Sequence, residues 1–219
     1  MAARDPYFDD LMSERQALVW AAAARRQLAR WEPLVAKHCL VLLEPQLDPP
    51  PAHPTAMTTT EYWQGETERH LLLVALRHLV VAAGLMDQPP SMDADVVAEL
   101  REVRDLNEHW DESMPVFQAE PRAGEPQFRS GKRFAARHPR HGPYCWWAWD
   151  GALGPLVAPT VSGTQVYELV DAVVEAAEAA RPDLAGTVPP AAPRPWRIPV
   201  AAGEMWWPDL DATTVSELG

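Results

Sequence analysis

The stretch from Glu61 to Met86 sets the strongest constraint on how this chain can fold. Apolar residues recur in it at intervals of three and four, which places them in a wide stripe along one side of a helix. The stripe consists of Leu72, Ala75, Leu76, Leu79, Val80 and Ala83. Thr58 and Glu61 have the spacing of a capping box, so the helix is expected to begin there. The sequence therefore predicts a long amphipathic helix in the first half of the chain.

Helical periodicity also covers most of residues 13–44. Ser13 and Gln16 have capping-box spacing at its start. Pro33 is expected to end or kink this helix near Trp31, although residues 34–43 could continue the same rod. The proline-rich run that follows cannot be helical and predicts a linker between the first two helices.

Two more helices are predicted further along. Ser91 is expected to cap a helix that runs to about Ser113, and Pro115 stops it. The last helix, residues 163–181, follows a third capping box formed by Ser162 and Gln165.

Between these two helices, residues 144–149 and 154–161 have the pattern of two short strands joined around Asp150 and Gly151. The predicted fold is mainly α: an up-down four-helix bundle with a short β-hairpin, about residues 144–161, inserted before the last helix. The bundle domain is expected to span residues 1–181. Residues 182–219 are rich in proline, alanine and acidic residues and predict a disordered or docked tail.

Charge limits the functions that such a chain can have. Its 31 acidic side chains against 19 basic ones give a net charge of -12, and a uniformly acidic surface repels nucleic acid and anionic membranes. One loop departs from this balance by carrying clustered basic residues with aromatic neighbours. Its candidate RNA-binding residues are Arg129, Lys132, Arg133, Arg137 and Arg140. The same loop could instead neutralise the acidic helices of its own bundle.

Other features favour a cytoplasmic protein without cofactors. The N-terminus lacks the apolar region of a signal peptide, and the longest apolar run is too short and too charged to span a bilayer. Cys39 and Cys145 lie far apart without zinc-site spacing, and no nucleotide-binding motif occurs. Glu66 and His70 are four residues apart, but a metal site in a bundle needs ligands from facing helices as well. We therefore expect no metal, no cofactor and no membrane partner.

One motif points to a specific chemistry. Arg104 is followed by Asp105 and, five positions after the arginine, by His109, all on the predicted third helix. Asp105 and His109 are four residues apart and share a helix face, so the carboxylate could orient the imidazole. A histidine as general acid/base beside an arginine that holds a phosphate suffices for attack by a ribose 2′-hydroxyl.

The Arg104–His109 string resembles the signature of HEPN domains, in which an arginine, a polar residue and then a histidine lie on a late helix of a four-helix bundle. This resemblance implies metal-independent RNA cleavage by a homodimer, with Arg104, Asp105 and His109 as catalytic residues. Because members include RNA-cleaving toxins, it also implies a possible antitoxin-like protein partner in a toxin–antitoxin pair. Other members are inactive and act as binding or dimerisation modules.

Two alternatives remain open at this point. The chain could be a non-catalytic HEPN-like or other helical-bundle interaction module, whose tail, with Trp196, Trp206 and Trp207, docks a partner. The string that contains Arg104 and His109 could also be an exposed, salt-bridged helix face.

Overall fold

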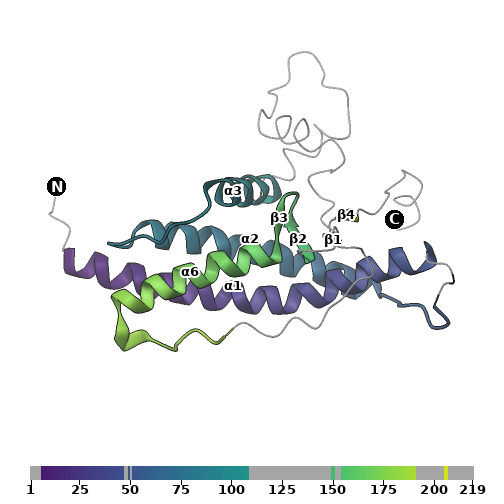
Figure 1. Cartoon of the computed structure of the whole chain (residues 1–219), viewed down its shortest axis with the longest axis horizontal. Coiled ribbons are helices and arrows are strands. Elements are labelled where there is room, and N and C mark those ends of the chain that lie inside the picture. The colour runs from purple at the N-terminus through teal and green to yellow at the C-terminus, as the bar shows by residue number, and fades with distance from the viewer. Residues whose placement is uncertain are drawn as a thin grey trace, which may run out of the picture.

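The structure is a computed structural model that describes residues 6–46, 49, 51–108, 149–150, 154–190 and 205–206. Three long helices lie side by side, and a shorter helix, α3, lies against α2 (Figure 1). The helices are α1 (Pro6–Leu43), α2 (Thr59–Gly84), α3 (Ala94–Glu108) and α6 (Gly163–Ala180), with short 3-10 turns η1 (Glu44–Gln46) and η2 (Pro182–Leu184). The predicted class, a mainly helical bundle with a short β-hairpin before the last helix, is confirmed.

The first helix differs from its prediction in where it begins, and it runs through Pro33 without ending. α1 begins at Pro6, so Ser13 lies inside it and does not cap it. Ser13 is buried, and its hydroxyl donates to the neighbouring carboxylate of Glu14 across 3.2 Å. Proline is favourable at a first helical position, where no intrahelical partner for an N–H exists. The helix also continues through Pro33, because buried residues on both sides, from Trp31 to Cys39, hold the rod against the core.

α1 and α2 form an antiparallel pair with a regular register. Trp20 stacks on His78 with ring centroids 4.3 Å apart, and Lys37 forms an ion pair with Glu61. Between these two contacts each helix advances by 17 residues in opposite directions. The predicted capping box of Thr58 and Glu61 is confirmed at the start of α2. Apolar residues of both helices meet in one core, among them Leu28, Trp31, Leu72, Leu76 and Leu79.

The starts of α3 and α6 test two further cap predictions. Asp93, rather than Ser91, caps α3: its Oδ1 accepts from the backbone N–H groups of Asp95 and Val96 at 2.8 and 3.2 Å. Asp93 directly precedes the first helical residue, and its carboxylate also favours the positive end of the helix dipole. The capping box of Ser162 and Gln165 before α6 is confirmed.

The hairpin belongs to a small antiparallel sheet, and residues 144–148 of its predicted first strand lie outside the described residues. β1 (Trp149–Asp150) pairs with β2 (Gly154–Ala158), with Trp149 opposite Pro155. Two more strands, β3 (Val161–Ser162) and β4 (Met205–Trp206), extend the sheet in the order β3-β2-β1-β4. β4 comes from the predicted tail.

The chain after α6 is also tied to the bundle. Val188 is buried in the core, and Arg25 of α1 donates from Nη1 to the carbonyl oxygen of Pro189 across 2.6 Å. Its Nη2 bonds Asp171 of α6 at 2.5 Å. Residues 182–190 therefore dock on the helices, while the predicted domain boundary at residue 181 stays a prediction.

Candidate functional site

The last turns of α3 carry two residues of the predicted active site. Arg104 donates from Nη1 to Oδ1 of Asp105 across 2.9 Å. The second oxygen of Asp105, Oδ2, lies 4.0 Å from Nε of Arg101, one turn earlier. The Asp105 carboxylate is thus held between two guanidinium groups on one helix.

These three side chains differ in their contact with water. Arg104 keeps 25% of its side-chain surface exposed, Asp105 45% and Arg101 66%. Arg104 is therefore packed along part of its length while still reaching the surface. A planar guanidinium with a restrained orientation is well suited to holding a phosphate group.

The position of α3 itself is fixed by contacts on two sides. Leu100, Val103 and Leu106 are buried in the core. Glu99 accepts from the backbone N–H of Thr160 at 2.7 Å and from the hydroxyl of the same residue, which lies in the turn between β2 and β3. α3 is thus anchored to the sheet through Glu99, in its first half, as well as to the bundle.

The rest of the predicted site lies outside the described residues. His109 follows the last residue of α3 directly, and the basic loop with Arg129, Lys132, Arg133, Arg137 and Arg140 comes later. The structure therefore brings Arg104 and Asp105 together and leaves the contact between Asp105 and His109 as a prediction.

A second polar site, which the sequence analysis missed, lies between α1 and α6. Glu32 is buried, and the hydroxyl of Tyr167 donates to its Oε2 at 3.4 Å. A Cβ atom added to Gly163, the first residue of α6, would lie 3.1 Å from Oε1 of Glu32. The carboxylate thus faces the N-terminus of α6, where the helix dipole favours negative charge. Glutamate in an otherwise apolar helical row was the only sequence signal for this site.

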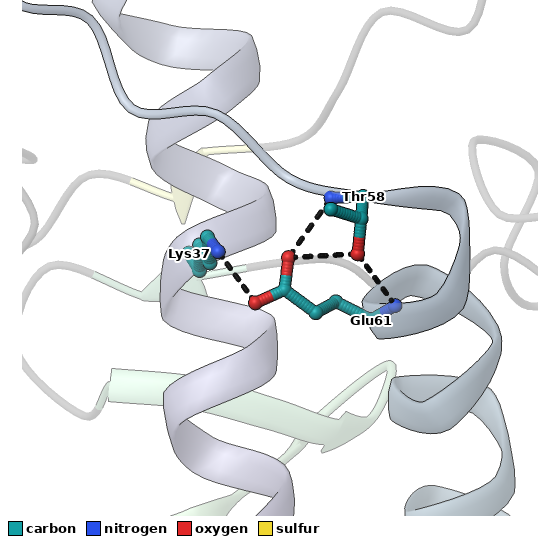
Figure 2. A network of polar contacts seen from close by, with 3 residues as sticks. All are labelled: Lys37, Thr58 and Glu61. Atoms are coloured by element: carbon teal, nitrogen blue, oxygen red, sulfur yellow. Dashed lines mark hydrogen bonds and ion pairs between the residues drawn. The ribbon is translucent and has the colours of Figure 1, made fainter.

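The contact between α1 and the start of α2 is a network centred on one carboxylate (Figure 2). Glu61 accepts from Nζ of Lys37 at 2.6 Å and from the backbone N–H and hydroxyl of Thr58 at 2.9 and 3.0 Å. The bond from Lys37, followed by those from Thr58, lowers the pKa of Glu61 to about 2. This network joins two helices and has the character of a structural contact.

The candidate metal ligands take other roles. The carboxylate of Glu66 lies 3.3 Å from Nη2 of Arg69, and burial raises its pKa. Across the described ranges, no three His, Cys, Asp or Glu side chains gather closely enough to hold a metal ion. Burial likewise raises the pKa of the Cys39 thiol, which keeps it protonated and unreactive.

A basic surface on α1 and α2 also escaped the sequence analysis. No acidic residue occurs in residues 15–31 of α1 or in residues 69–86, which cover the C-terminal part of α2 and the two residues after it. Since the register pairs Trp20 with His78 and Lys37 with Glu61, these two stretches lie side by side. The absence of acidic residues from both stretches, in so acidic a chain, was the signal that could have found this surface.

The fold and site define a helical bundle with a small antiparallel sheet and an Arg-Asp pair at the end of its third helix. No family model, no curated protein and no solved structure matches the chain. Among the helices that the structure describes, none has both the length and the apolar content needed to cross a membrane.

Proposed function

We propose that this chain is a HEPN-like dimer that cleaves RNA without a metal ion. Arg104 holds the scissile phosphate, His109 acts as general acid/base, and Asp105 orients His109. The observation that carries the proposal is the Arg104–Asp105 pair, 2.9 Å apart and partly exposed at the end of an anchored helix.

The geometry supports the proposed role of Arg104. Its side chain is three-quarters covered, and the core contacts of α3 and the bonds from Thr160 to Glu99 fix the helix beneath it. A prepositioned guanidinium stabilises the charge that develops on a phosphate in the transition state without a reorganisation cost.

The proposed reaction needs no further group. His109 removes the proton from a ribose 2′-hydroxyl, and the 2′-oxygen attacks the adjacent phosphorus. The bond from phosphorus to the 5′-oxygen breaks, and that oxygen takes up the proton that the imidazolium of His109 gives back. The products are a 2′,3′-cyclic phosphate and a 5′-hydroxyl end, so atoms and charge balance.

An RNA cleavage assay in EDTA, with analysis of product ends, tests the proposal. His109→Ala is expected to lower the cleavage rate about 10²- to 10⁴-fold, the usual contribution of general acid–base catalysis. His53→Ala is a matched control, because His53 is exposed in the linker before α2. Arg104→Ala is compared with Arg101→Ala, which removes the other guanidinium beside Asp105.

Cleavage that leaves 2′,3′-cyclic ends and is lost in His109→Ala and Arg104→Ala, but not in the two controls, supports the proposal. Equal cleavage by wild type and His109→Ala contradicts it. Absence of cleavage by a folded dimer on several RNAs also contradicts it, and favours a non-catalytic interaction module.

A further inference from the structure

Two rows of exposed residues lie on the sides of α1 and α2 that carry Lys37 and His78, each of which contacts the other helix. The row on α1 contains Arg15, Arg26 and Arg30, which share a helix side with Lys37, the residue that reaches Glu61 of α2. The row on α2 shares the side of His78, which stacks on Trp20 of α1. We name these two rows the α1–α2 seam; its α2 row consists of Leu71, His78, Val81 and Leu85.

The α2 row of the seam is unusually apolar for a surface. Leu71 is 42% exposed, Val81 41% and Leu85 69%. Val19, 49% exposed, adds a further apolar side chain within the arginine row. Several large apolar side chains exposed along one line are typical of a binding surface.

The charges of the seam restrict what can cover it. The α1 row carries the exposed arginines Arg15, Arg26 and Arg30, and residues 15–31 and 69–86 contain no acidic residue. A second copy of the seam would bring like charges together, which opposes self-association. Nucleic acid would satisfy the arginines, but Leu71, Val81 and Leu85 of the α2 row offer bases no aromatic ring to stack on. The occupant that fits both rows is acidic and apolar.

The C-terminal end of this chain has that composition. Arg197 is its last basic residue. After β4, residues 207–219 hold three carboxylate side chains, those of Asp209, Asp211 and Glu217. Apolar residues recur among them at Trp207, Leu210, Val215 and Leu218.

The tail starts close enough to reach the seam. Trp206 of β4 pairs with Trp149, which pairs with Pro155 of β2, and Pro155 packs at Gly163 beside Glu32 of α1. In the α1–α2 register, Glu32 lies level with Glu66, five residues or about 8 Å before Leu71 along α2. Thirteen residues span up to about 43 Å when extended, which leaves length to pass around the pair of helices.

We propose that the α1–α2 seam binds residues 207–219 of the same chain. The apolar residues of the tail cover Leu71, Val81 and Leu85, and its carboxylates lie along the arginine row of α1. The proposal does not depend on RNA cleavage.

The test uses a chain that ends at Trp206, which keeps β4, and a fluorescent peptide of residues 204–219. The truncated chain is expected to bind the peptide with a Kd below about 0.1 mM, since a tethered segment acts at an effective concentration of about a millimolar. Full-length protein should bind the same peptide about tenfold more weakly, because its own tail competes. Rising salt should weaken the binding, because exposed ion pairs are screened.

Variants of the seam identify the surface. Arg26→Glu with Arg30→Glu is expected to weaken peptide binding at least about tenfold. Arg101→Glu, an equally drastic change at an exposed position of α3, should leave it unchanged. Circular dichroism confirms that each variant is folded.

Three outcomes would overturn the proposal. The peptide could fail to bind the truncated chain, or it could bind truncated and full-length protein equally. The Arg26→Glu and Arg30→Glu pair could also leave binding intact. If full-length and truncated protein bind single-stranded RNA or phosphatidylglycerol vesicles equally well through Arg26 and Arg30, the seam belongs to that ligand and not to the tail.

Discussion

Polar side chains on α1 and on α3 are held in opposite ways. Glu32 of α1 is buried against the first turn of α6, and His38 is half-buried, with its ring centroid 5.4 Å from that of Tyr62 on α2. On α3, Arg104 and Asp105 pair with each other and keep 25% and 45% of their side chains exposed. The first two contacts join helices, whereas the third lies within one turn of a single helix.

This difference separates residues that maintain the fold from residues that can carry function. Removing a buried polar group leaves its partners without hydrogen bonds in a place that water does not reach, and stability falls. Removing an exposed ion pair costs little, because water replaces the lost contacts. A change on α3 that alters activity but not stability would therefore report on function directly.

The largest effect is expected at Glu32. Glu32→Ala should lower the free energy of unfolding by about 3 kcal/mol, because the hydroxyl of Tyr167 and the start of α6 lose a buried acceptor. Urea denaturation measures the change. Glu175→Ala, on an exposed position of α6, serves as the control and should stay within about 0.5 kcal/mol of wild type. A loss below about 1 kcal/mol for Glu32→Ala would show that the contact with α6 contributes little.

The second effect concerns pH and His38. Burial lowers the pKa of His38 from its ordinary 6.5 to about 4, so the folded state favours the neutral ring. A pKa that is lower in the folded chain than in the unfolded chain contributes stability at pH values above the unfolded pKa. This stability is lost as the pH falls from 6.5 towards 4. The free energy of unfolding of wild type should fall by about 2 kcal/mol between pH 6.5 and pH 4. This loss is smaller than a fully buried ring would give, because the ring of His38 keeps some contact with water.

His38→Gln should remove this pH dependence, and His53→Gln, in the exposed linker, should retain it. The measurement is the urea midpoint at a series of pH values between 7 and 4. Parallel curves for wild type and His38→Gln would mean that His38 is protonated as readily in the folded chain as in the unfolded one.

Local signals in the sequence predicted most of the helical fold. The capping boxes at Thr58 and Ser162 succeeded because each side chain bonds backbone groups only three residues away. The cap at Ser13 failed because nothing in that local pattern showed that the helix would begin at Pro6. At Pro33 the local pattern left open an end or kink near Trp31 or a continuous rod, and burial of Trp31 and Cys39 on either side keeps the helix continuous.

Contacts between distant segments were beyond local signals. Trp206 of β4 lies opposite Trp149 of β1, which is 57 positions earlier in the chain, and Met205 lies opposite Asp150.

 
The two strands meet only after the chain has passed through β2, β3 and α6. The contact between Glu32 and α6 likewise joins segments that are far apart in the sequence. At the candidate site, the helical pattern correctly predicted that Arg104 and Asp105 lie on one helix. It did not predict that Arg101 also contacts the carboxylate of Asp105.

The smallest effect on stability, and the sharpest test of the comparison, is expected at Asp105. Asp105→Asn keeps the size of the side chain and removes its charge, so it weakens the contacts with both Arg104 and Arg101. Because the carboxylate is 45% exposed, the free energy of unfolding should change by no more than about 0.5 kcal/mol. Urea denaturation at pH 7 measures this change, with Arg101→Ala as a control that removes only the weaker of the two contacts.

If Asp105 orients His109, the same variant should lower the rate of RNA cleavage while stability stays near that of wild type. A variant that is stable and fully active would remove Asp105 from the proposed site and leave it as a surface ion pair. A loss of several kcal/mol would instead place Asp105 with Glu32 among the residues that hold the fold together. Each result therefore shows whether the end of α3 maintains the fold or carries function, because removing a buried polar contact lowers stability more than removing an exposed one.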